Sequence, residues 1–450
     1  MLYQMQFKKN DVNSLFFAFS SLKKYTITRA MLYFPALINQ KIIKFTASHF
    51  KIHLVFKKIS CYLFFLISFL TFSQSIPYSD NTVISVLTCG PGDDLYSKFG
   101  HSAFRIQDFN KHYDVVYNYG VFDFTKPNFY TNFVKGKLYY RLDKAPFNYF
   151  YQLYQNENRA VKKQVLNLSL EQRKKLIAFL ENNAKPENAT YQYDFFYNNC
   201  ATKMRAVLDE VFPNEIVIKD SHITTSFTMR DLINNNVPHN TWANVGINIA
   251  LGSVIDVKAT TDEYQFLPKY IFEAFNNASI KNTPLIKETS TILAINNSNL
   301  DKQRFSILSP YCLLSILSLL IIWITYADFK KKKRNKTLDF ILLFITGLTG
   351  MFSLLLWFAT NHTTTANNLN ILWAFAPNLI IAFITLSKKT QKWISNYFKL
   401  LIALLISLML AWVFKIEAFA YGMTPIFLAL GVRYVYLSKY FKSINVQLKE

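Results

Sequence analysis

The chain has 450 residues, of which 51% are hydrophobic and 17% aromatic, and its formal net charge is +22. Lys and Arg exceed Asp and Glu by 10 − 1 = +9 in residues 1–75, by 25 − 23 = +2 in residues 76–305 and by 15 − 4 = +11 in residues 306–450. Because the excess lies beside apolar runs, it indicates charge that flanks a membrane and argues against nucleic-acid binding.

Residues 1–56 show no sustained hydrophobic period, and we predict a leader that is a mis-assigned start or a processed extension. Residues 57–75 then have the pattern of a signal peptide. Lys57 and Lys58 form the basic region, the apolar core is CYLFFLISFLTF, and Ser-Gln-Ser supplies small residues for cleavage. The core is too short to cross a bilayer comfortably, although an uncleaved anchor is the alternative.

From Val83 the pattern becomes that of a globular domain, which we predict over residues 76–275. The expected strands are residues 81–89, 101–108, 114–124 and 160–168. The expected helices are a short one with Asp93 as its N-cap and Gly100 at its end, one after Ser169 with a capping box to Gln172, and several over residues 228–275. The polar residues 276–308 predict a linker.

Five apolar segments in the last third predict transmembrane helices within residues 309–437. They cover approximately residues 309–327, 338–359, 369–386, 398–414 and 420–437, and Arg433 makes the fifth the weakest. The loop FKKKKRNK and the loop with Lys388, Lys389 and Lys392 are basic, whereas the loop TNHTTTANN is not. This bias predicts a multi-pass protein of the inner membrane with residues 76–305 in the periplasm and a cytoplasmic tail at 438–450.

The stretch YDFFYNNCATKM holds the strongest candidate for a nucleophile. Two Asn residues precede Cys200 and helix-forming residues follow it, so the thiol lies at a predicted helix N-terminus, where the helix dipole favours a thiolate. Cys200 also has two structural interpretations, a buried inert thiol and a bridge to Cys89. Cys61 and Cys312 lie in apolar segments, so this bridge is the only disulfide expected.

His101 is the candidate base, because it follows a glycine at the start of a predicted strand, where another chain segment can approach. Asn118 lies on the neighbouring strand and shares the face of His101 if the two strands pair in register, so it could orient the imidazole. A structural histidine is the alternative interpretation. The sequence has no HExxH motif, CxxC pair or Asp cluster, and we expect neither a metal site nor a cofactor.

Several motifs, in one order, resemble the periplasmic domain of the Lnb-type lipoprotein-modifying proteins. They are VLTCGPGDDLYSKFGHSAFRI, VVYNYGVFDF, PNFYTNFVKGKLYY and YDFFYNNCATKMR, followed by TMRDLI, TWANVGINIALG and QFLPKYI. The resemblance runs from about Val83 to about Phe275, and NHTTTANNLNILWAFAPNL extends it into the membrane region. The residues before Lys57 have no counterpart in it.

That family is similar to circularly permuted NlpC-like enzymes of the papain fold, in which His precedes Cys in the chain. The resemblance implies an α+β papain-like extracytoplasmic domain followed by an all-α transmembrane domain of about five helices. It further implies that Cys200 and His101 transfer a fatty acyl chain from the diacylglyceryl Cys of a lipoprotein to the α-amino group of that residue. The permuted relatives usually have a second His where this chain has Asn118.

We therefore predict a membrane-bound thiol acyltransferase whose partners are lipoproteins and the phospholipid membrane. Asn199, beside the thiol, and His362, in the outward loop, are candidate substrate-binding residues, although an ordinary polar loop also accounts for His362. Two other classes stay open: an NlpC-like cell-wall amidase or peptidase, and a non-catalytic envelope module with Cys89 and Cys200 bridged.

Overall fold

A computed structural model describes residues 78–295, 306–387 and 393–447. These residues belong to one compact unit, Pro77–Glu450. The predicted leader and signal peptide lie outside the described residues.

Seven strands form one antiparallel sheet in the order β10-β5-β1-β2-β3-β4-β6. They are β1 (Val83–Cys89), β2 (His101–Asp108), β3 (Tyr113–Val121), β4 (Tyr139–Pro146), β5 (Val161–Leu166), β6 (Thr190–Gln192) and β10 (Ile286–Leu293). A second sheet contains β7 (Ile216–Ile218), β8 (Ala278–Ile280) and β9 (Thr283–Pro284). The predicted hairpin of residues 101–108 and 114–124 is thus β2 with β3.

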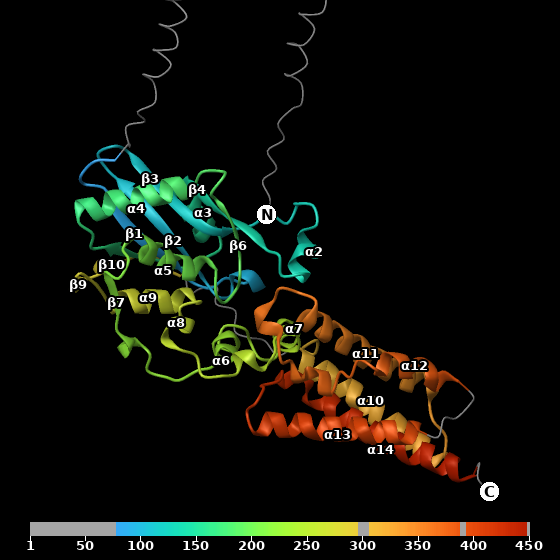
Figure 1. The fold of residues 1–450 in the computed structure, drawn as a ribbon. Coiled ribbons are helices and arrows are strands. Elements are labelled where there is room, and N and C mark those ends of the chain that lie inside the picture. The colour runs from blue at the N-terminus through green and yellow to red at the C-terminus, as the bar shows by residue number, and fades with distance from the viewer. Residues whose placement is uncertain (1–77, 296–305, 388–392, 448–450) are drawn as a thin grey trace, which may run out of the picture. The chain divides into compact units, whose positions relative to one another are not determined.

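Helices cover both faces of the large sheet, because its central strands carry apolar side chains on both sides (Figure 1). In β1, Ile84 and Val86 pack under α4 (Leu170–Asn183), α5 (Cys200–Val211) and α9 (Pro268–Asn276). Leu87 and Cys89 instead face α3 (Phe147–Asn156). The predicted capping box of Ser169 with Gln172 begins α4.

Two predictions about this domain are corrected by the structure. The short helix before Gly100 is the 3-10 turn η1 (Leu95–Ser97), and its N-cap is Asp94, without a side-chain hydrogen bond, rather than Asp93. Within the predicted linker, residues 278–293 form β8, β9 and β10. The polar sequence of residues 286–293 did not indicate a strand, because β10 is an edge strand, in which exposed Thr and Glu side chains are tolerated.

The expected helical section after the cysteine stretch is present. It consists of α6 (Met229–Asn234), α7 (Trp242–Ala250), η3 (Ser253–Ile255), α8 (Thr261–Tyr264) and α9, and the turn η2 (Asp220–His222) precedes it. A further short helix, α2 (Phe129–Val134), lies between β3 and β4 and has no buried residue.

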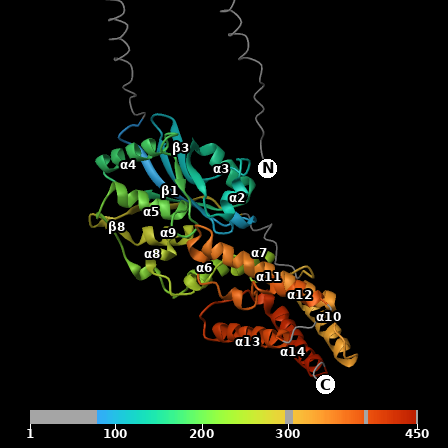
Figure 2. The same cartoon turned by 45° about the vertical axis from the view of Figure 1, so that its right-hand side comes forward.

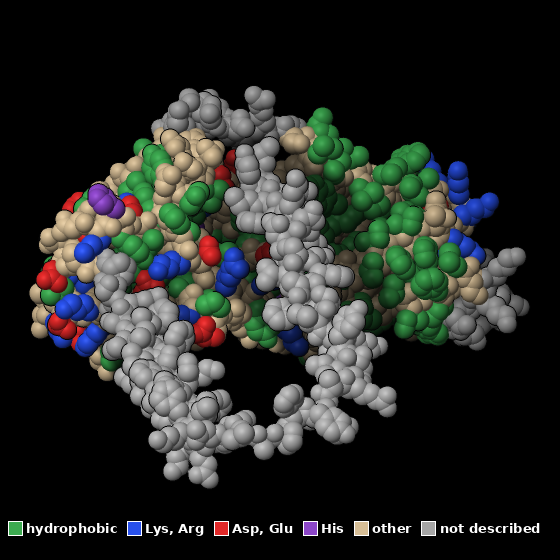
Figure 3. Space-filling view, turned by 90° about the horizontal axis from the view of Figure 1, so that it is seen from above, with side chains coloured by type: hydrophobic (Ala, Val, Ile, Leu, Met, Phe, Trp, Pro, Cys, Tyr) green, Lys and Arg blue, Asp and Glu red, His purple; other side chains and the backbone are tan. Residues whose placement is uncertain are grey.

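The last third is helical. It contains α10 (Pro310–Lys330), α11 (Lys336–Phe358), η5 (Thr363–Thr365), η6 (Leu369–Leu372), α12 (Asn378–Leu386), α13 (Ile394–Val413), η7 (Tyr421–Met423) and α14 (Thr424–Gln447). Among the described residues, α10, α11 and α13 are long and apolar enough to cross a membrane. Figure 3 shows hydrophobic side chains over the visible face of this part.

Two of the five predicted membrane segments differ from a simple span. The third begins with the turn η6 and continues as α12, which has only 9 residues. The fifth belongs to α14, which has 24 residues and runs on to Gln447, so much of the predicted tail is helical. The helical membrane region is confirmed, and five spans remains a prediction.

Arg433, in the middle of α14, is fully buried and neutralised by two carboxylates. Its guanidinium lies 2.8 Å from Asp328 and 2.7 Å from Asp339, which also binds Arg334 at 3.0 Å. Charged groups among apolar helices are tolerated when they pair in this way. Arg433, which made the fifth predicted segment the weakest, therefore connects α14 to α10 and α11.

The loop between α11 and α12 packs against α7, and Figure 2 shows α7 beside α11. Asn368 donates to the carbonyl of Ile249 at 2.8 Å, and Asn370 donates to the carbonyl of Asn248 at 3.0 Å. Gly252 also approaches this loop so closely that a Cβ there would overlap the Ala366 carbonyl. These contacts fix the α/β domain to one end of the membrane helices.

Candidate active site

Cys200 is the first residue of α5, and Asn199 caps this helix. The Asn199 Oδ1 accepts hydrogen bonds from the backbone N–H groups of Ala201 at 2.8 Å and Thr202 at 2.9 Å. The Thr202 hydroxyl accepts from the Asn199 N–H at 2.8 Å, which completes a capping box. The predicted helix N-terminus is thus present, and its positive end lies at the thiol.

Cys200 and His101 form a pair that favours separated charges. Burial opposes the thiolate, but the positive charge of His101, its hydrogen bond and the N–H groups of Ser102 and Ala201 outweigh burial and lower the pKa of Cys200. Burial also opposes the imidazolium, yet the Cys200 charge and the hydrogen bonds to Cys200 and Asn118 raise the pKa of His101. The arrangement therefore stabilises a thiolate beside an imidazolium.

Asn118 holds the other side of the imidazole. Its Oδ1 lies 2.5 Å from the His101 Nε2. An amide oxygen only accepts, so this bond places a proton on Nε2 and leaves Nδ1 for the thiol. The strands pair with Phe104 opposite Tyr117, which puts Asn118 on the face of His101 as the sequence predicted.

Gly120 is a site residue that sequence reasoning did not single out. It has a φ of +88°, and a Cβ built on it would lie 3.6 Å from the Cys200 Cβ and 3.9 Å from the Tyr191 hydroxyl. The pairing of β3 with β4 is irregular between Asn118 and Val121, around this glycine. A glycine at the end of a strand was the available signal, since it marks a bulge or a close approach.

Cys89 lies directly opposite His101 in the pairing of β1 with β2. Its side chain is buried, and burial raises the pKa of this thiol to about 12, with a smaller opposing effect from the Tyr154 hydroxyl. Cys89 and Cys200 are both free thiols in the structure. The bridge that the sequence left open is thus not formed here.

Asn199 does not fit the substrate-binding role predicted for it. Besides capping α5, it donates from Nδ2 to the carbonyls of Phe195 and Phe266, both at 2.7 Å, and it is only 3% exposed. Both ends of the side-chain amide are already bonded within the protein, so neither is left for a substrate. Its role is structural, namely to fix the start of α5.

His362, the other predicted binding residue, contacts α2. Its Nε2 lies 2.9 Å from the Phe133 carbonyl, and the two rings are 6.5 Å apart. The structure therefore brings together Cys200, His101 and Asn118, whereas His362 joins the membrane region to the α/β domain.

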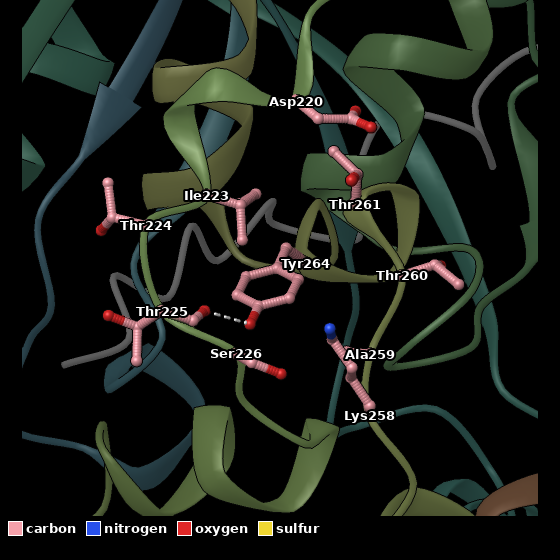
Figure 4. Close-up of a pocket in the computed structure, with 10 residues that line it drawn as sticks. All are labelled: Asp220, Ile223, Thr224, Thr225, Ser226, Lys258, Ala259, Thr260, Thr261 and Tyr264. Atoms are coloured by element: carbon pink, nitrogen blue, oxygen red, sulfur yellow. Dashed lines mark hydrogen bonds between the residues drawn. The ribbon is translucent and has the colours of Figure 1, made fainter.

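A hollow of about 570 Å³ lies between η2 and α8, away from the thiol (Figure 4). Threonines form much of its lining, and Asp220, Lys258 and Tyr264 complete its polar part. The Tyr264 hydroxyl donates to the Thr225 carbonyl at 2.7 Å. Cys200, His101 and Asn118 are not among the residues that line this hollow. Within residues 78–295, 306–387 and 393–447, no group of three or more His, Cys, Asp or Glu is placed to hold a metal ion.

The fold and the site define a protein in which an α/β domain with a Cys–His–Asn arrangement precedes a region of apolar helices, three of which, among the residues described, are candidate membrane spans. Comparison with family models identifies an Lnb N-terminal periplasmic domain at residues 72–235 and an Lnb transmembrane domain at residues 302–443. The chain belongs to the Lnb family, which confirms the resemblance seen in its motifs. Membership indicates a membrane-associated, lipoprotein-modifying protein with a periplasmic segment. Searches of curated proteins and of solved structures gave no match.

Proposed function

We propose that this protein is a cysteine-dependent acyltransferase that moves a fatty acyl chain from the diacylglyceryl Cys of a bacterial lipoprotein to the α-amino group of that residue. The observation that carries the proposal is the geometry around one imidazole. His101 is held by Asn118 on its Nε2 side and is hydrogen-bonded to Cys200, whose pKa is lowered. This is the arrangement that activates a thiol nucleophile.

In the first step, the Cys200 thiolate attacks the ester carbonyl carbon. A carbon–sulfur bond forms, the carbon–oxygen bond of the ester breaks, and the departing glyceryl oxygen takes the proton of the His101 imidazolium. The N–H of Cys200 is the amide of the first turn of α5 that Asn199 does not cap, and it is available to the developing oxyanion. The product is a thioester on Cys200.

In the second step, the α-amine attacks the thioester carbonyl. His101, now neutral, accepts a proton from the amine, the new amide bond forms, and the carbon–sulfur bond breaks to restore the thiolate. His101 gives up a proton in the first step and accepts one in the second, so the proposed reaction requires no cofactor or metal. A nearby bilayer limits competing hydrolysis by keeping the acyl group in apolar surroundings.

The charge of the loops supports a location in the inner membrane with the C-terminus in the cytoplasm. The segment FKKKKRNK connects α10 to α11, whereas the loop after α11 has no Lys or Arg and packs against α7 of the α/β domain. A basic loop stays in the cytoplasm, so the opposite end, with the catalytic domain, faces the periplasm. The thiol is thereby on the side where lipoprotein N-termini are exposed.

The test is mass spectrometry of lipoprotein N-termini from cells that carry the wild-type protein, Cys200→Ala, Cys200→Ser or no protein. The expected result is that both substitutions reproduce the acyl pattern of the deletion. Cys312→Ala, which alters a free thiol in α10, is the matched control and retains the wild-type pattern. Unchanged lipoproteins with altered cell-wall fragments would support the amidase class instead, and no change in either would support a non-catalytic module.

A further inference from the structure

An exposed aromatic surface is formed by α2 and the turn before it, residues 124–137. Tyr130 is 70% exposed, Phe124 is 51% exposed and Phe133 is 49% exposed. None of the six residues of α2 is buried. Rings that remain this exposed on a short helix mark an interaction surface rather than part of the core.

This aromatic surface is bonded to the end of a membrane helix. The Asn361 N–H donates to the Lys135 carbonyl at 2.9 Å, and His362 bonds the Phe133 carbonyl. Gly136, with a φ of +70°, allows the close approach, because a Cβ there would lie 2.9 Å from the Asn361 carbonyl carbon. Asn361 follows α11 by three residues, and α11 is one of the candidate spans. The surface therefore lies near the level where that span leaves the membrane.

Charge on the aromatic surface is also suited to a lipid headgroup layer. Lys126, Lys135 and Lys137 are exposed, and residues 124–137 contain no Asp or Glu, the preceding acidic residue in the sequence being Asp123. Aromatic rings concentrate at the membrane–water boundary, and lysines beside them attract phosphate groups. A protein partner would need no such combination next to the end of a span.

A row of rings leads from this aromatic surface toward the thiol. Phe129 stacks with Phe122 at 6.0 Å, Phe122 lies 4.9 Å from Tyr140, and Tyr140 stacks with Tyr193 at 4.3 Å. A Cβ built on Gly120 would lie 3.9 Å from the Tyr193 ring and 3.6 Å from the Cys200 Cβ, so the Tyr193 ring lies near the thiol. An acyl chain that followed these rings would remain in apolar contact between the bilayer and the nucleophile.

We propose that residues 124–137 form a lipid-contact element that lies in the headgroup layer of the periplasmic leaflet, on the side of the α/β domain that leads to Cys200. The occupant of the aromatic surface is a phospholipid bilayer, and the element touches it whether or not acyl transfer takes place. The inference thus stands apart from the reaction proposed above.

The test places the photo-crosslinking residue p-benzoylphenylalanine at Tyr130 in the full-length chain and irradiates intact membranes. Phe109 is the matched control, because it is 71% exposed but lies in the turn between β2 and β3, at the opposite end of these strands from His101. Adducts are identified by mass spectrometry of the labelled peptide. Every arm is repeated with Cys200→Ala, and Phe133 is a second probe position.

The expected result is phospholipid adducts at Tyr130 and Phe133 that exceed those at Phe109 several-fold, in the active and Cys200→Ala forms alike. The proposal is overturned if lipid adducts at both probe positions are no more frequent than at Phe109. It is also overturned if the probes capture a second copy of this chain or another protein in place of lipid. Under the proposed function Cys200→Ala transfers no acyl chain, so the arms with this variant measure lipid contact alone. The crosslinking result is therefore independent of whether the proposed acyl transfer is correct.

Discussion

Replacing Asn118 by Ala tests how the imidazole is held. The substitution removes the hydrogen bond of 2.5 Å to the His101 Nε2 and leaves the thiol and its helix untouched. Asn118 favours the charged form of His101, so its loss lowers the pKa of His101. His101 is then less readily protonated, so its positive charge stabilises the Cys200 thiolate less, and the pKa of Cys200 rises toward its ordinary value.

The magnitude follows from the type of bond. A hydrogen bond to a charged group contributes about 1.5–3 kcal/mol. If the whole contribution is lost in the transition state, the rate falls roughly ten- to a hundredfold, since about 1.4 kcal/mol corresponds to a factor of ten. Loss of the correct imidazole orientation acts in the same direction.

The assay is the rate of Cys200 alkylation by iodoacetamide as a function of pH, with lipoprotein acylation measured in parallel. In the wild type the alkylation rate increases as the pH rises past the pKa of Cys200, which is lowered, because the thiolate is the form that reacts. Asn118→Ala moves this rise to higher pH. Asn118→Asp retains an acceptor and adds a negative charge that favours the imidazolium, so its rise stays at low pH.

An Asn118→Ala protein that folds normally but keeps the wild-type alkylation profile and acylation rate would refute the reasoning. So would an Asn118→Asp protein whose profile moves to higher pH as far as that of Asn118→Ala. His101→Ala is the reference, because it removes the positive charge altogether and sets the largest expected displacement.

Three further substitutions test other parts of the structure. Gly120→Ala introduces a side chain at a φ of +88° beside Cys200. We expect the free energy of unfolding to fall by about 1–2 kcal/mol and Cys200 to be alkylated more slowly. An unaltered melting temperature would contradict this. Asn199→Ala removes the cap of α5, so the melting temperature falls by an amount equivalent to about 0.5–2 kcal/mol, and a raised KM at unchanged stability would restore the binding role. Asp339→Asn removes a buried carboxylate partner of Arg433 and destabilises the protein in detergent by about 3–5 kcal/mol. The double variant Asp339→Asn with Arg433→Met recovers stability. Equal melting temperatures of the wild type and Asp339→Asn would argue against the ion pair.

Local signals in the sequence were sufficient for much of this architecture. Alternating residues predicted β1, β2, β3 and β5, and Ser169 with Gln172 predicted the start of α4. The strand β10 was missed because an edge strand tolerates a polar composition, so that its pattern looks like a linker. Its place in the sheet depends on pairing with β5, which is more than 100 residues earlier in the chain.

The candidate site was predictable only where residue type carried the information. Cys200 and His101 followed from their positions at a helix start and a strand start, and Asn118 followed from strand register. The N–H of Ser102, which helps to stabilise the thiolate, is a backbone group that no residue type announces. The capping role of Asn199 was not predicted, because a cap and a binding residue have the same side chain and differ only in what surrounds it.

Cys89 and Cys200 show why composition alone does not identify a candidate nucleophile. Both are free thiols close to His101, and burial opposes ionisation in both. Cys89 lies in the middle of an apolar layer under α3, where little offsets burial, so its pKa is raised to about 12. Cys200 lies at the start of α5, where the imidazolium and backbone N–H groups reverse the direction. The opposite pKa shifts of the two thiols are therefore produced by the helix start and by β2, which supplies both His101 and an N–H group.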